Sequence, residues 1–181
     1  LPTTVSAARL AIMTLTGGQE AGNDGHFRPI DVRTTPGTMF HPVSPAPVYM
    51  YFWPGMQAVD VIHRALSEAM PDAVPAGNGG DHGFITWWGE TPDGNLWGDA
   101  TDHVVGQGAN AGADGQAPLM HIAAACVRQT PVEVWESRNP FIVEKAEFAA
   151  DSGGAGRFRG GPGRGRPRSC ESRPGRARMS V

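Results

Sequence analysis

The sequence is poor in lysine and cysteine, and it contains no long apolar run. Its 181 residues include one lysine, Lys145, and two cysteines. ATP binding through a P-loop needs the GxxxxGK[ST] pattern, which is absent, so this mode of binding is excluded. Two cysteines cannot form a disulfide framework, which favours reduced thiols and a cytoplasmic location. Without an apolar run of about 20 residues, no membrane partner is expected.

The sequence also lacks an even distribution of charge. Residues 1–156 hold 17 acidic and 7 basic side chains, whereas residues 157–181 hold eight arginines and one glutamate. From residue 162 onward the chain is mostly Arg, Gly, Pro and Ser, which cannot offset the entropy lost on ordering. We therefore expect a folded region over 1–161 and a disordered basic tail over 162–181. Nucleic acid is not an expected partner, because the body is acidic and Phe158 is the last aromatic residue.

The chain starts with neither an initiator methionine nor the basic and apolar regions of a signal peptide. We therefore expect it to begin inside a longer protein. Its hydrophobic content of 40% is enough for a core, while 25 glycines and 16 prolines indicate many turns.

Apolar periodicity predicts two helices, one that starts at Thr3 or Thr4 and one over about 56–70. Alternation predicts strands over 27–32, 84–88, 132–136 and 141–148, with a hairpin turn at 91–94. The run 119–127 fits either a buried strand or a buried helix. We predict an α+β (mixed) fold with few helices packed on a mainly antiparallel or mixed β framework and long Gly/Pro-rich loops.

A glycine-rich stretch at 151–161 is the most distinctive local feature. It reads DSGGAGRFRGG, with five glycines and two arginines in eleven residues. Such backbone can form a concave anion-binding nest, and Arg157 and Arg159 can add bidentate donors for phosphate or carboxylate. The alternative is a tight turn whose arginines face water. A second glycine-rich loop, 106–115, has Ala111 where the dinucleotide fingerprint GxGxxG needs its third glycine, so a nucleotide site is not indicated.

Acidic residues and histidines supply few other candidates. Asp81-His82 and Asp102-His103 are acid–imidazole neighbours, but a metal or base site needs several such groups to converge. His121 fits a buried core histidine. Glu133 and Glu136, three apart on a predicted strand, point to opposite faces and cannot pair. We therefore predict no metal site built by this chain alone.

Four groups of motifs, in order, resemble the hydantoinase B / 5-oxoprolinase family over roughly residues 1–161. The first is NDGHFRPIDV at 23–32 with TPGT at 35–38 and PAP at 45–47. The second is ALSEAMP at 65–71, and the third is GQGA at 106–109 with Asp114-Gly115. The fourth is PVEVWE at 131–136, which leads to DSGGAGRFRGG at 151–161.

This resemblance implies a B-type subunit that works with an A-type ATP-binding subunit on a small-molecule cyclic amide. The A-type subunit phosphorylates the amide oxygen, and the B-type subunit completes the reaction by ring-opening hydrolysis or, in the related acetone and acetophenone carboxylases, by carboxylation. ATP and a divalent metal are expected in the full complex, with no cofactor bound by this chain alone. The residues placed at a site on this interpretation are catalytic Asp114, Glu133 and Asp151, and the anion-binding Arg157, Arg159, Gly153 and Gly154.

The resemblance covers only part of a B-type subunit. B-type chains are far longer, the match corresponds to their C-terminal portion, and the metal ligands of the carboxylase branch lie in their N-terminal half. A lone chain of this length is then inactive without its partner subunit and the missing half. A non-catalytic fragment or partner-binding module is the alternative from another class. After residue 161 the sequence departs from the family, and a frameshift near this point is our hypothesis for the change.

Overall fold

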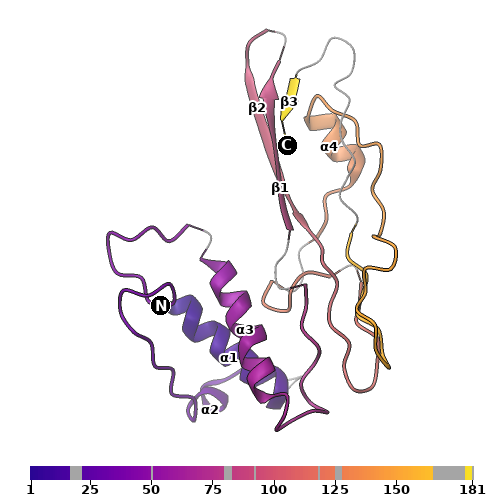
Figure 1. The fold of residues 1–181 in the computed structure, drawn as a ribbon. Helices are drawn as coiled ribbons and strands as arrows, with labels where there is room; N and C mark the ends of the chain where they lie inside the picture. Colours follow the sequence, from indigo (N-terminus) through magenta and orange to yellow (C-terminus); the bar gives the residue numbers. More distant parts are fainter. Residues whose placement is uncertain are drawn as a thin grey trace.

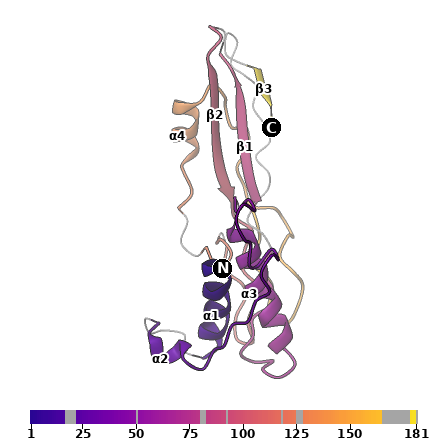
Figure 2. The same ribbon diagram turned by 90° about the vertical axis from the view of Figure 1, so that its left-hand side faces the viewer.

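The computed structural model describes residues 1–16, 22–49, 51–79, 83–91, 93–117, 119–124, 128–164 and 178–180. Figures 1 and 2 show a helical end, which contains α1, α2 and α3, and a long β1–β2 hairpin that extends away from it with α4 alongside. The predicted α+β fold class is confirmed. The elements, in chain order, are α1 (Pro2–Thr16), α2 (Asp24–Phe27), α3 (Phe52–Leu66), β1 (Gly83–Glu90), β2 (Leu96–His103), α4 (Val132–Arg138) and β3 (Arg178–Ser180).

Helices α1 and α3 pack against each other through small apolar residues. Ala7 and Ala11 of α1 are buried together with Val59 of α3. An added Cβ on Gly55 of α3 would lie 2.9 Å from Thr3 Cγ2. Because these residues are small, the two helix backbones approach closely, and the pair forms a core of its own rather than covering the sheet. None of the described helices is long and apolar enough to cross a membrane.

Both predicted helices are present, with shifted bounds for the second. It begins at Phe52 and ends at Leu66, whereas apolar spacing predicts about 56–70. Pro54 falls in its first turn, where backbone N–H groups have no partner within the helix and proline is tolerated. Beyond Leu66 the backbone continues as turns, in which Ala69 N donates to Leu66 O at 3.1 Å.

The β1–β2 hairpin confirms the strand predicted over 84–88 and the turn predicted at 91–94. The strands pair antiparallel, from Gly83 opposite His103 to Glu90 opposite Leu96. Thr91 N donates to Asn95 O at 2.8 Å, and Gly94 has a φ of 84°, which glycine adopts readily. Strand β3 pairs antiparallel with the other edge of β1, which gives the order β2-β1-β3.

An aromatic cluster holds α4 against the hairpin. Trp87 of β1 lies 5.4 Å from Trp135 of α4 and 5.4 Å from Phe141, measured between ring centroids. All three side chains are buried. Trp97 of β2 adds a fourth ring, 6.0 Å from Phe141. This is the second hydrophobic core, and it lies under one face of the hairpin.

The strand predicted over 132–136 is wrong, because these residues form α4. Val132 and Trp135 both pack on the aromatic cluster, and a helix brings residues three apart to one face whereas a strand separates them. Pro131 precedes the helix, and its carbonyl accepts from the backbone N–H of Val134 at 3.1 Å. The alternation of valine with polar residues indicated a strand periodicity, whereas the i, i+3 spacing of Val132 and Trp135 is the one that the structure follows.

The predicted strands over 141–148 and 27–32 are also wrong within the described residues. Val143 N donates to Glu136 Oε1 at 2.8 Å instead of to a neighbouring strand, and Phe148 makes only an isolated bridge with Arg164. In the earlier segment, the Asn23 side chain accepts from Gly25 N and caps α2, which takes up Phe27. In the later segment a side chain thus binds a backbone N–H that a strand would have used, and in the earlier one a capped helix includes the first residue of the predicted strand.

The run 119–127 forms neither predicted element over its described part, although Met120 and His121 are buried; residues 125–127 lie outside the described residues. The tail predicted over 162–181 differs at its start, since Arg164 N donates to Val104 O at 3.0 Å. Arg178–Ser180 form β3. For 165–177 and 181, outside the described residues, disorder stays a prediction.

Candidate functional site

Three stretches that are distant in sequence meet at the base of the hairpin, and we call residues 76–79, 106–116 and 151–163 the glycine-loop cluster. Backbone hydrogen bonds join them. Gly161 N donates to Gln107 O at 2.8 Å, and Gly115 N donates to Arg159 O at 2.7 Å. Ala76 N donates to Ala109 O at 2.8 Å. The second and third stretches are the two glycine-rich motifs of the sequence, so the fold brings these motifs together.

Several glycines of this cluster are required by close contacts between backbones. An added Cβ would overlap most severely with a backbone carbonyl oxygen of the cluster at five positions. Only one of the five also has a left-handed φ, namely Gly106 at 78°. The glycine density of the motifs is therefore explained first by packing of main chain on main chain. The five positions are Gly106, Gly108, Gly115, Gly153 and Gly161.

Arg159 is the best-anchored charged residue of the cluster. Its backbone N–H donates to Asp114 Oδ1 at 2.7 Å, and its guanidinium donates through Nη2 to Asp151 Oδ1 at 2.8 Å. Asp151 has a φ of 58°, an uncommon conformation for a residue other than glycine. With Gly153, these residues line a hollow of about 250 Å³. The structure thus brings together four of the seven predicted site residues.

The remaining three predicted site residues lie elsewhere. Glu133 is exposed on the first turn of α4. Arg157 is exposed with its guanidinium carbon 5.4 Å from the ring centroid of Phe158, and of the described hollows in the cluster neither is lined by Arg157. Gly154 lines the adjoining hollow of about 320 Å³. Arg157 and Arg159, although two residues apart, therefore have different surroundings.

Polar side chains that were not predicted as site residues form hydrogen bonds with the backbone of these loops. Ser152 Oγ accepts from Gly163 N at 3.0 Å and donates to Ala149 O at 2.8 Å. Asn110 Oδ1 accepts from Ala113 N at 2.8 Å. Serine and asparagine beside glycine commonly make such local turns, which is the signal that was available in the sequence.

The first arginine of the predicted tail, Arg164, is a structural residue. Its guanidinium carbon lies 5.6 Å from the ring centroid of Trp135, and its Nη1 donates to Gln129 Oε1 at 3.2 Å. Its carbonyl accepts from His103 Nε2 at 2.6 Å. His103, one of the histidines considered for chemistry, thus ties the end of β2 to the chain beyond the glycine-loop cluster.

His121 is the core histidine that the sequence predicts. Its side chain is fully buried, Nδ1 accepts from Ala123 N at 3.1 Å, and Nε2 lies 3.3 Å from Asp60 Oδ1 on α3. Asp81-His82 lies outside the described residues. Within the part of the chain that the structure describes, no three His, Cys, Asp or Glu side chains gather as a metal site.

The chemistry available at the cluster is recognition of an anion by a fixed cation. The Arg159 side chain is 60% exposed and the Asp151 side chain 86% exposed, so the pair faces solvent. The guanidinium has five donors in a planar fork, and the bond to Asp151 occupies one of them. The remaining donors of the guanidinium are available without displacing the backbone anchor at Asp114.

Comparison with known proteins gives consistent results. A family model described as hydantoinase B/oxoprolinase matches residues 1–181. A protein of Pseudomonas sp. assigned as the B-type subunit of a D-/L-hydantoinase is 30% identical over 141 residues, which are 78% of this chain and 23% of that protein. The beta subunit of caprolactamase from Pseudomonas jessenii is 31% identical over 168 residues, 88% of this chain and 28% of that protein. The chain thus spans only 23% to 28% of these relatives.

A solved structure shares the fold. The nucleotide-free structure of acetone carboxylase matches with a TM-score of 0.68 and 24% sequence identity, over 89% of this chain and 22% of that one. At this identity the likeness concerns the fold alone. The family match extends from the first residue to the last, and it includes the glycine-loop cluster. As its motifs predict, the chain belongs to the hydantoinase B/oxoprolinase family.

Proposed function

We propose that this chain is part of the B-type subunit of an ATP-dependent cyclic-amide hydrolase. The observation that carries the proposal is the pair of relatives named for hydantoinase and caprolactamase activity. Hydantoin and caprolactam differ in ring size and substituents, but both contain an amide within a ring. The shared chemistry is cleavage of the ring C–N bond, so the substrate class proposed here is a small cyclic amide.

An A-type partner supplies the activation in this scheme. An amide carbonyl is a poor electrophile, and transfer of the γ-phosphoryl group of ATP to its oxygen turns that oxygen into a leaving group. Water then adds to the carbonyl carbon, and the ring C–N bond breaks with protonation of nitrogen to leave an acyl phosphate. A second water hydrolyses the acyl phosphate and releases inorganic phosphate. The products are the ring-opened acid, ADP and inorganic phosphate. ATP and a divalent metal are assigned to the assembled complex.

The glycine-loop cluster is proposed to hold the anionic group that forms in this reaction. Arg159 is the binding residue, because its guanidinium is exposed and can form charge-assisted hydrogen bonds with phosphate or carboxylate. Asp114 and Asp151 act as positioning residues, since the first fixes the backbone of Arg159 and the second orients its guanidinium. Glu133 lies outside this cluster, and no role is proposed for it.

The test is reconstitution of the B-type subunit that contains this sequence with an A-type subunit. Ring-opened product and ADP are measured with hydantoin, 5-oxoproline and caprolactam. We expect ATP-dependent ring opening, and we expect Arg159→Ala to reduce turnover at least 100-fold, about 3 kcal/mol of transition-state stabilisation. Arg157→Ala, two residues away but outside the hollow, is the matched control and should change turnover less than about threefold.

Three results decide against the proposal. Equal turnover in Arg159→Ala and the unmodified enzyme would remove Arg159 from the site. ATP consumption that requires bicarbonate and a ketone, without ring opening, would assign the enzyme to carboxylation instead. Absence of ATP-dependent chemistry on every substrate in a complete, folded complex would favour the non-catalytic alternative. Far-UV circular dichroism of each variant shows whether a loss of turnover reflects a loss of structure.

A further inference from the structure

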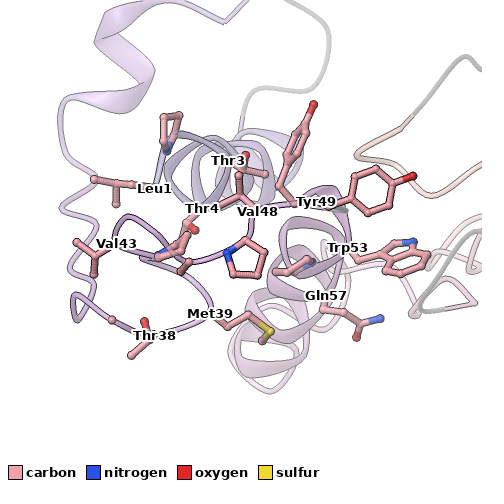
Figure 3. Close-up of a pocket in the computed structure, with 17 residues that line it drawn as sticks. Leu1, Thr3, Thr4, Thr38, Met39, Val43, Val48, Tyr49, Trp53 and Gln57 are labelled. Carbon is pink, nitrogen blue, oxygen red and sulfur yellow. The ribbon is translucent and has the colours of Figure 1, made fainter.

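A large apolar groove lies at the helical end, on residues outside the glycine-loop cluster. It has a volume of about 950 Å³. Figure 3 shows its wall, in which Leu1 and Thr3 come from the start of α1, Val43 and Val48 from the proline-rich loop, and Trp53 from the first turn of α3. We call this feature the α1–α3 groove.

The α1–α3 groove is largely apolar and uncharged, although it is open. None of its lining residues is charged, whereas 18% of the chain's residues are. Six large hydrophobic residues of its wall are exposed, and the extremes are Leu1 at 44% and Tyr49 at 86%. A contiguous apolar surface without charges is typical of contacts that are permanently covered. The six residues are Leu1, Met39, Val43, Val48, Tyr49 and Tyr51.

Two observations bear on what covers the groove. The curated relatives and the solved acetone carboxylase chain are much longer than the matched region, which is 22% to 28% of each. In addition, α1 begins at Pro2, and both Leu1 and Pro2 line the groove. A segment that joins α1 at its amino-terminal end in a subunit of that length therefore starts at the groove itself.

We propose that the α1–α3 groove is an intramolecular docking site, filled by apolar side chains from the segment of the same polypeptide that precedes Leu1 in a full-length B-type subunit. The occupant carries few charges, because a charged group here would lose water and find no counter-charge in the wall. The inference depends on membership of the family and is independent of the reaction proposed above.

Hydroxyl-radical labelling tests the proposal. The labelling rates of Met39 and Tyr49 are measured in a whole B-type subunit and in the 181-residue chain, each normalised to an added peptide that contains methionine and tyrosine. We expect both rates to fall at least fivefold in the whole subunit. The protection should be independent of protein concentration and should not need the A-type subunit.

Other occupants give different results, and each overturns the proposal. Equal rates in the two proteins mean that the groove stays open. Protection that grows with protein concentration, together with a dimer in light scattering, identifies a second copy. Protection that appears only when the A-type subunit is added identifies that partner. None of these readings depends on turnover, so failure here leaves the proposed reaction untouched.

A pair of variants gives a second measurement. Tyr49 and Leu96 are both 86% exposed, but Tyr49 lies in the groove and Leu96 begins β2 on the hairpin. In the whole subunit, Tyr49→Glu should lower the midpoint of thermal unfolding by several degrees, while Leu96→Glu should leave it within about one degree. An unchanged midpoint for Tyr49→Glu would contradict an occupied groove.

Discussion

Gly153 and Gly154 are neighbours in the chain, yet the structure predicts opposite effects for a methyl group added at each. A Cβ at Gly153 would overlap the carbonyl oxygen of Gly160 across the loop, whereas a Cβ at Gly154 would have nothing within 4 Å. Neither glycine has a left-handed φ. The comparison of Gly153→Ala with Gly154→Ala therefore isolates steric overlap from the general effect of replacing glycine.

The magnitude follows from the contacts that must open. Forcing a methyl group into packed surroundings costs about 1–3 kcal/mol. Movement of the Gly160 carbonyl also threatens the hydrogen bond from Gly160 N to Gly154 O, at 2.9 Å, which contributes about 0.5–1.5 kcal/mol. We therefore expect Gly153→Ala to lower the free energy of unfolding by about 2–4 kcal/mol. Gly154→Ala should raise it by up to about 1 kcal/mol, because alanine restricts the unfolded chain.

Urea and thermal unfolding followed by circular dichroism measure both variants. For a chain of this size, the expected loss lowers the midpoint temperature of Gly153→Ala by roughly 4 °C or more. Amide hydrogen exchange at Gly115, Gly160 and Gly161 adds a local readout, because these N–H groups form backbone hydrogen bonds within the glycine-loop cluster. If the two alanine variants unfolded alike and exchanged alike, the explanation of the glycines by close backbone contact would be refuted.

Two further predictions concern His121 and Asp93. His121→Ala should lower the free energy of unfolding by about 2–5 kcal/mol in urea titrations. The reason is that the substitution leaves a cavity and removes the contacts to Ala123 N and Asp60. A loss below about 0.5 kcal/mol would contradict a structural role for His121. Hydrogen bonding from the Thr91 side chain, then from the Asp93 backbone, holds the pKa of Asp93 below its usual value. The ionised carboxylate therefore stabilises the hairpin at neutral pH, and this contribution is lost as the pH falls below about 3.9. Thr91→Val should raise the pKa of Asp93 measured by NMR, and an unchanged pKa would contradict that cause.

Local chemistry explains which elements the sequence was able to predict. Strand β1 and its turn follow from the apolar segment 84–88 and from TPDG, and α3 follows from apolar residues at helical spacing. Strand β2, with the sequence LWGDATDH, was not predicted. The helix α4 was missed because Val-Glu-Val-Trp-Glu satisfies both a strand alternation and an i, i+3 helical face. The choice is made by the contact of Trp135 with Trp87, a residue on another element. The local sequence around Trp135 does not reveal its contact with Trp87.

For the candidate site, the sequence likewise indicates the residue types but not which of them meet in space. Asp114, Asp151 and Arg159 belong to motifs that the sequence singles out, and chemistry selects their residue types. Their association depends on a contact between residues 45 positions apart, from Arg159 N to Asp114 Oδ1, which spacing does not reveal. Glu133 is also a carboxylate and comes from an equally distinctive motif, but it lies on α4, outside the glycine-loop cluster. Residue type alone therefore could not separate it from the two aspartates.

The backbone contacts also determine where an anion reaches Arg159. Its N–H is bound by Asp114, its carbonyl by Gly115 N, and its guanidinium by Asp151, so main chain and side chain are fixed before any ligand arrives. Fixed donors lose little entropy on binding. The Arg159 side chain is nevertheless 60% exposed, and the hollow beside it has a volume of only about 250 Å³. Under the proposed function, a substrate ring would be enclosed here only when another polypeptide segment covers this face. The defect of Arg159→Ala should then appear in the assembled enzyme while the fold of the chain stays intact.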